Sequence, residues 1–70
     1  MNDLEFHYDE ESGQYRAVAE HGDYWVDGML SCYVTYDSAG TNEKIIGGGA
    51  DTGSLITMCN LHHKNILRSS

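Results

Sequence analysis

A cysteine and two histidines close to the C-terminus could together bind a metal ion. Cys59, His62 and His63 occupy positions i, i+3 and i+4 of a predicted helix, so their side chains share one side of it. Thiolate and imidazole are the ligands that zinc prefers, but structural zinc sites usually combine two local pairs, and this chain offers one. The other candidates for a fourth ligand are His7, His21 and Cys32. We therefore expect no metal and no cofactor, and we expect Cys32 and Cys59 to be inert core thiols; the sequence leaves open whether they touch.

The residues Asp51, Thr52, Gly53 and Ser54 resemble the active-site signature of aspartic proteases. In that family the aspartate is the catalytic carboxylate, and it shares one proton with a second aspartate. An apolar strand leads into the motif of the family, whereas residues 47–50 here are three glycines and an alanine. The apolar-apolar-glycine element that follows the motif in the family precedes it in this chain. We therefore expect Asp51 or Thr52 to cap a helix, and we expect no enzymatic activity.

The same stretch also has part of the spacing of a phosphate-binding loop, through Gly48, Gly53 and Ser54. The lysine that pairs with phosphate in such loops is missing, because Gly53 leads directly to Ser54. Asp51 would in addition repel an anion. A flexible connection before a helix is the interpretation that we adopt for this segment.

Hydrophobic periodicity divides the chain into four strands and one helix. Apolar and polar residues alternate in segments that predict strands roughly over 3–9, 14–20, 24–36 and 43–47. The apolar period becomes helical roughly over 53–68, where one side of the wheel holds Leu55, Ile56, Met58, Cys59, His62, His63, Ile66 and Leu67. The predicted fold is a two-layer α+β sandwich, in which a C-terminal helix covers one face of a four-stranded, mostly antiparallel sheet. Residues 1–70 are expected to form one small acidic domain.

Gly28, in the middle of the predicted strand over 24–36, indicates a bulge or bend. A bulge shifts the alternation by one residue, so Trp25 points into the core if there is a bulge and Val26 does if there is none. The sequence leaves these alternatives open. Beyond the glycine, the pattern predicts a core face made of Leu30, Cys32 and Val34.

The acidic residues are concentrated in the first half of the chain. The 70 residues carry 11 acids and 4 Lys+Arg, for a formal net charge of −7. Residues 1–37 hold nine of these acids against Arg16 alone, whereas residues 38–70 hold two acids against three cations. This charge argues against direct binding of nucleic acid and against binding to anionic membranes. Because close like charges destabilise a small fold, their concentration indicates a surface for a basic partner.

Tyrosines and the single tryptophan lie among these acids, and such residues are the usual anchors of protein interfaces. The expected function is that of a small inhibitor that occupies a basic, nucleic-acid-binding surface of another protein, as a nucleic-acid mimic. Size and charge are typical of phage-encoded anti-CRISPR or anti-restriction proteins. The residues expected to contact the partner are Glu5, Asp9, Glu10, Glu11, Glu20, Asp23, Trp25, Asp27 and Tyr33.

The alternative is a homodimeric or metal-bound structural module that uses Cys59, His62 and His63. Two cysteines are too few for a disulfide framework, which indicates a reducing compartment. There is no run of about 18 apolar residues to span a bilayer, and the acidic start does not match a secretory signal. We expect a cytoplasmic location, in the host cell if the chain is phage-encoded.

Overall fold

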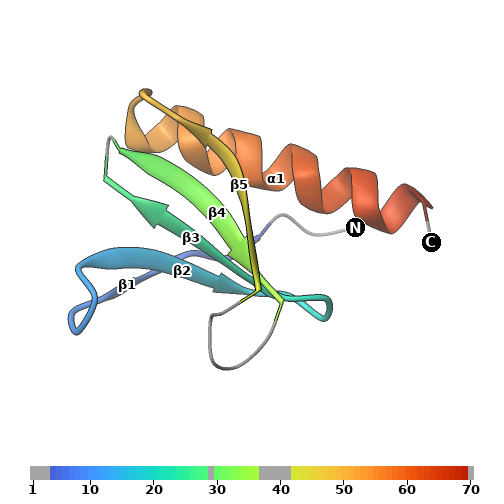
Figure 1. Ribbon diagram of the computed structural model, residues 1–70, viewed down its shortest axis with the longest axis horizontal. Coiled ribbons are helices and arrows are strands. Elements are labelled where there is room, and N and C mark those ends of the chain that lie inside the picture. Colours follow the sequence, from blue (N-terminus) through green and yellow to red (C-terminus); the bar gives the residue numbers. More distant parts are fainter. Residues whose placement is uncertain (1–3, 29, 37–41, 70) are drawn as a thin grey trace.

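The fold is a meander of five antiparallel strands with one helix packed on one face of the sheet (Figure 1). It was established from a computed structural model that describes residues 4–28, 30–36 and 42–69. The elements are β1 (His7–Asp9), β2 (Gln14–Val18), β3 (Asp23–Asp27), β4 (Ser31–Thr35), β5 (Glu43–Gly48) and α1 (Thr52–Ser69). The strands lie side by side in the order β1-β2-β3-β4-β5, and every neighbouring pair is antiparallel. The predicted α+β class with a covering C-terminal helix is confirmed.

The prediction of four strands is wrong, because the segment over 24–36 folds into the hairpin β3–β4. Gly28 lies in the turn with a φ of 54°, a left-handed conformation that glycine adopts without steric cost. The amide of Leu30 donates a hydrogen bond to the carbonyl of Asp27 at 2.9 Å and closes this turn. Gly28 therefore reverses the chain instead of bulging a continuous strand. Leu30, predicted to face the core, lies beyond the strand end and is 72% exposed.

The hairpin also decides between the two alternatives for Trp25 and Val26. Val26 is fully buried under α1, whereas Trp25 points to the opposite face of the sheet. The first strand is shorter than the predicted 3–9, since β1 begins at His7, and Asp3 lies outside the described residues. Leu4 and Phe6 precede β1 and still pack against the core. The second strand ends at Val18 instead of residue 20.

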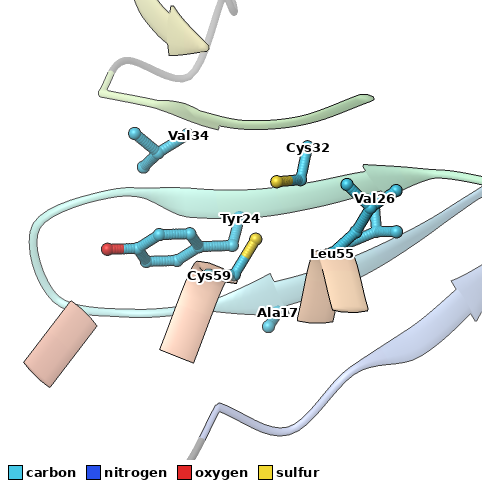
Figure 2. Packing of buried hydrophobic residues seen from close by; sticks show 7 residues of the cluster. All are labelled: Ala17, Tyr24, Val26, Cys32, Val34, Leu55 and Cys59. Carbon is cyan, nitrogen blue, oxygen red and sulfur yellow. The ribbon is translucent and has the colours of Figure 1, made fainter. Parts of the chain in front are cut away.

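The core lies between the sheet and α1 and is formed by few side chains (Figure 2). Its buried members are Ala17, Tyr24, Val26, Cys32, Val34, Leu55 and Cys59. The two cysteines are free thiols on opposite sides of the interface, and they are close enough to hydrogen-bond to each other. Burial raises the pKa of the Cys59 thiol. Both features agree with the prediction of inert core thiols, and they show that the two thiols touch.

Glycine and a bulge allow β5 to approach α1 closely. A Cβ atom on Gly47 would lie 2.5 Å from the sulfur of Met58, so a larger residue there would require the end of that flexible side chain to shift. Cys32 pairs with Gly47 and Tyr33 pairs with Ile45, which makes Ile46 the inserted residue of a bulge. As a result Ile46 packs against the core, while Ile45 is 68% exposed.

Candidate functional site

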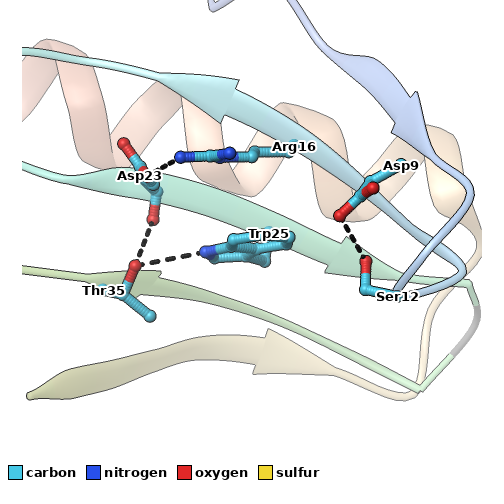
Figure 3. Close-up of polar contacts among 6 residues, drawn as sticks. All are labelled: Asp9, Ser12, Arg16, Asp23, Trp25 and Thr35. Atoms are coloured by element: carbon cyan, nitrogen blue, oxygen red, sulfur yellow. Dashed lines mark hydrogen bonds and ion pairs between the residues drawn. The ribbon is translucent and has the colours of Figure 1, made fainter. Parts of the chain in front are cut away.

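The face of the sheet opposite α1 is not covered by any other described element, and we call it the open face (Figure 3). The strand register arranges its side chains in three rows that run across the strands. The central row consists of His7, Arg16, Trp25, Tyr33 and Ile45, each the pairing partner of the next. The first flanking row lies two residues from the central row, measured along the strands, and contains Val18, Asp23, Thr35 and Glu43. On the other side, the second flanking row contains Asp9, Gln14, Asp27 and Ser31.

Two aromatic rings form the middle of the central row. The rings of Trp25 and Tyr33 are nearly parallel, with an interplanar angle of 14° and centroids 6.4 Å apart. The indole Nε1–H of Trp25 donates to Thr35 Oγ1 at 3.1 Å. The hydroxyl of Tyr33 donates to Gln14 Oε1 at 2.7 Å. These bonds to both flanking rows hold the rings in place, so binding over them would cost little side-chain entropy.

A guanidinium group already occupies one end of this aromatic pair. Arg16 lies over the Trp25 ring, with its Cζ 5.1 Å from the ring centroid, and forms an ion pair with Asp23 (Figure 3). Aromatic faces attract cations electrostatically, and the carboxylate adds a charge-assisted hydrogen bond. The open face therefore has the chemistry to bind a guanidinium through a ring and a carboxylate together.

Most carboxylates of the open face remain available. Within the described ranges, Asp23 is the one carboxylate of this face that forms a salt bridge. Asp27 and Glu43 have no cation within ion-pair distance there, and Asp9 accepts hydrogen bonds from Ser12 and from the amide of Glu11. The face also exposes apolar surface, since Val18 is 71% exposed. Of the nine acids in the described ranges, eight lie on the strands or beside them and Asp51 caps α1, while Lys64 and Arg68 lie on α1 and Arg16 and Lys44 lie on strands.

The structure brings together five of the nine predicted partner-binding residues on the open face: Asp9, Asp23, Trp25, Asp27 and Tyr33. Glu5 borders this face, where it lines a shallow hollow together with His7, Arg16 and Val18. The other three residues are exposed in turns. Glu10 and Glu11 lie in the β1–β2 turn, and Glu20 lies in the β2–β3 turn.

Sequence reasoning missed the remaining members of the central and flanking rows. They are His7, Gln14, Arg16, Val18, Ser31, Thr35, Glu43 and Ile45. Alternation within single strands carries part of the signal, because Arg16 alternates with Tyr15 and Ala17. The grouping of Arg16 with Trp25 and Tyr33 depends on the register between strands, which turn geometry and the burial of one sheet face set together.

A second polar cluster joins the β2–β3 turn to α1. The hydroxyl of Tyr24 lies 2.7 Å from His21 Nε2 and 2.7 Å from His62 Nδ1. Since the hydroxyl has one proton, one neutral imidazole accepts that proton and the other donates its N–H. The His63 ring stacks on His21 with centroids 5.5 Å apart, and its buried Nδ1 has no hydrogen-bond partner among the described residues. Burial is the largest cause that lowers the pKa of both His21 and His62.

This arrangement does not assemble the metal site considered from the sequence. Cys59 is buried against Cys32, whereas His62 hydrogen-bonds to Tyr24. In the described ranges, no three His, Cys, Asp or Glu side chains are placed to hold a metal ion together.

Asp51 caps the helix, as the sequence predicted. Its Oδ1 accepts a hydrogen bond from the amide of Ser54 at 2.7 Å, and its carbonyl accepts one from the amide of Leu55 at 3.0 Å. The bond from Ser54 lowers the pKa of the Asp51 carboxyl. Helix capping is therefore the role that the structure gives to Asp51.

Comparisons with known proteins give no relative, since no family model, curated protein or solved structure matches the chain. Among the described residues, α1 lacks the long apolar stretch that a helix crossing a bilayer needs.

Proposed function

We propose that this chain is a small protein-binding inhibitor whose open face occupies a basic, nucleic-acid-binding surface of a partner protein. One observation carries the proposal. The open face combines a fixed aromatic pair, Trp25 and Tyr33, with carboxylates on both sides of it, and most of these have no cation partner in the described ranges.

The chemistry of such a contact follows from charge complementarity. Nucleic-acid-binding surfaces hold phosphates with Lys and Arg side chains. Carboxylates on the open face would meet those cations in place of phosphates and so block the groove. The net charge of −7 would steer the encounter and make the association fast and sensitive to salt. Glu5, Glu10, Glu11 and Glu20 contribute to this steering from the border and the turns.

The aromatic pair supplies apolar contact area at the centre of the interface, which the carboxylates do not provide. Tyr and Trp dominate the energy of many protein interfaces when they are desolvated at the centre and surrounded by a polar rim. Trp25 and Tyr33 have this central position, with Asp23 and Asp27 in the two flanking rows. The narrower form of the proposal is a non-enzymatic, phage-encoded inhibitor of anti-CRISPR or anti-restriction type that acts in the host cytoplasm. It rests on size and charge.

The test is capture of the partner followed by competition with nucleic acid. The tagged chain is used to isolate proteins from host lysate, and the captured protein is purified and bound to its own nucleic acid. We expect stoichiometric amounts of the chain to displace the nucleic acid. The double variant Trp25→Ala, Asp27→Lys should fail to displace it, and Leu61→Ala, a change at a 57% exposed helix residue, should act like wild type.

A captured protein that keeps its nucleic acid in the presence of excess chain would contradict the proposal. So would an affinity that does not change between about 50 mM and 200 mM salt, a range over which phosphate-like contacts weaken strongly. Measuring the size of the purified chain, with and without a chelator, tests the homodimeric or metal-bound alternative.

A further inference from the structure

The open face has dimensions as well as charge, and they restrict the shape of the partner. The flanking rows lie two residues on either side of the central row. At about 3.4 Å per residue, the two rows of carboxylates are therefore about 14 Å apart. The central row crosses five strands, which at about 4.8 Å between neighbours gives a length of about 19 Å.

Resting on the proposed function, we infer that the partner places a cationic amphipathic helix across the strands, along the central row. An α-helix with its side chains is about 10–12 Å wide, which matches the space between the two rows of carboxylates. Its turns are about 5.4 Å apart, close to the strand spacing, so one side chain per turn can meet each strand. An extended segment would be narrower and would point every second side chain away from the face.

The charges set the pattern that such a helix must carry. An apolar stripe would lie on Trp25 and Tyr33, and Lys or Arg on each side of the stripe would reach the flanking rows. Asp23 and Glu43 face one side of the helix, while Asp9 and Asp27 face the other. A helix with cations on only one side would leave one row of carboxylates without partners.

Arg16 shows on a small scale how such a cation is held. Its guanidinium lies over the indole of Trp25 and pairs with Asp23 in the first flanking row. A cationic side chain of the partner helix would make the same combination of contacts with Tyr33 and Asp27 or Glu43. The requirement is for the pattern of a basic helix, which is also the element that many proteins insert into the major groove of DNA.

Three synthetic peptides of 18 residues and identical composition test this inference. The first has a leucine stripe with Lys and Arg on both sides; the second has the same residues mixed around the helix; the third keeps the first pattern but carries D-amino acids at two central positions, which break the helix. None contains Trp or Tyr, so the fluorescence of Trp25, the single tryptophan of the chain, reports binding at the open face. We expect the first peptide to bind about tenfold more tightly than either of the others at low ionic strength.

A pair of charge-matched variants locates the contact. Asp27→Asn with Glu43→Gln removes two charges from the flanking rows, whereas Glu10→Gln with Glu11→Gln removes two from the β1–β2 turn. We expect the first double variant to bind the amphipathic peptide about tenfold more weakly than wild type. The second should lose less than about threefold in affinity. Equal binding of all three peptides would contradict the inference that the partner element is a helix. Absence of binding by all three would contradict it as well. The proposed function would then still be judged by the nucleic-acid competition described above.

Discussion

Trp25 and Tyr33 are cross-strand partners whose rings lie nearly parallel, 14° apart, on the face of the sheet that α1 leaves uncovered. In a sheet this small, aromatic residues are expected to fill the core. Here the buried core consists of smaller side chains and Tyr24, and Trp25 points to the other face because it lies between the buried Tyr24 and Val26 of β3; its indole N–H donates to Thr35. An apolar pair fixed in this position and surrounded by carboxylates is the basis of the functional account.

Replacing Trp25 with alanine should separate binding from stability. Trp25 is half-buried by its neighbours on the open face and does not contribute to the core under α1. We expect Trp25→Ala to weaken binding to the captured partner at least about thirtyfold, as for an interface hot spot of about 2 kcal/mol. Calorimetry of binding and a thermal melt of the same variant measure the two effects. Weakened binding that is fully explained by loss of folded protein would contradict this assignment.

The hydrogen-bonded cluster of His21, Tyr24 and His62 predicts that the protein loses stability in mild acid. Burial lowers the pKa of His21 and His62 in the folded chain, while both titrate near 6.5 when unfolded. Below about pH 6.5 the unfolded chain therefore takes up protons that the folded chain does not, and the free energy of unfolding falls. The measurement is the melting temperature at about pH 8.0, 7.0, 6.0 and 5.5, values that bracket the unfolded-state pKa. The melting temperature should be constant at the two higher values and decrease at the two lower ones.

The matched variant for this prediction is His21→Gln with His62→Gln, which should flatten the pH dependence over the same range. Most carboxylates titrate near pH 4 and contribute little there. A wild-type melting temperature that is unchanged or higher at the acidic end would show that the two imidazoles are not held in their neutral form.

The hydroxyl of Tyr24 should contribute measurably to stability because it bonds to two rings at once. Tyr24→Phe keeps the ring in the core but leaves His21 and His62 without their shared partner. We expect a loss of about 1–3 kcal/mol in denaturant unfolding, the usual cost of buried polar groups that lose their hydrogen bonds. Tyr8→Phe is the control, since Tyr8 is 57% exposed and should tolerate the change. Equal effects of the two substitutions would count against the bridging role.

Asp51 should behave as a helix cap. Asparagine also accepts a hydrogen bond from the helix amides, so Asp51→Asn should leave the melting temperature nearly unchanged, and Asp51→Ala should lower it by about 4 °C. The measurement is a thermal melt of both variants, followed by circular dichroism at about 222 nm, where the signal reports helix content. Equal destabilisation by Asn and Ala would mean that Asp51 has a role other than capping.

The sequence predicted the class of fold because its strongest signals are local. The helical apolar period over 53–68 and the capping by Asp51 depend on neighbouring residues, and both are confirmed. The division of 24–36 into two strands depends on Gly28, which can equally form a bulge or a turn. That choice is made by the pairing of β3 with β4, which is a tertiary interaction.

The candidate site was predicted in part for the same reason. Charge is a property of the sequence, so the acidic residues were identifiable before the fold was known. The central row is not visible in the sequence, because Arg16, Trp25 and Tyr33 are separated along the chain and meet only through the register. The bulge that turns Ile45 outward and Ile46 inward likewise depends on pairing with β4.

The most direct measurement of the central claim uses Trp25 as the only tryptophan of the chain. Chain labelled with 5-fluorotryptophan gives a single ¹⁹F resonance from the middle of the open face. On addition of the captured partner, we predict that this resonance shifts and that its sensitivity to exchange of solvent H₂O for D₂O is lost. A complex that forms while the resonance keeps its position and its solvent sensitivity would show that the partner binds elsewhere, and the account would be wrong.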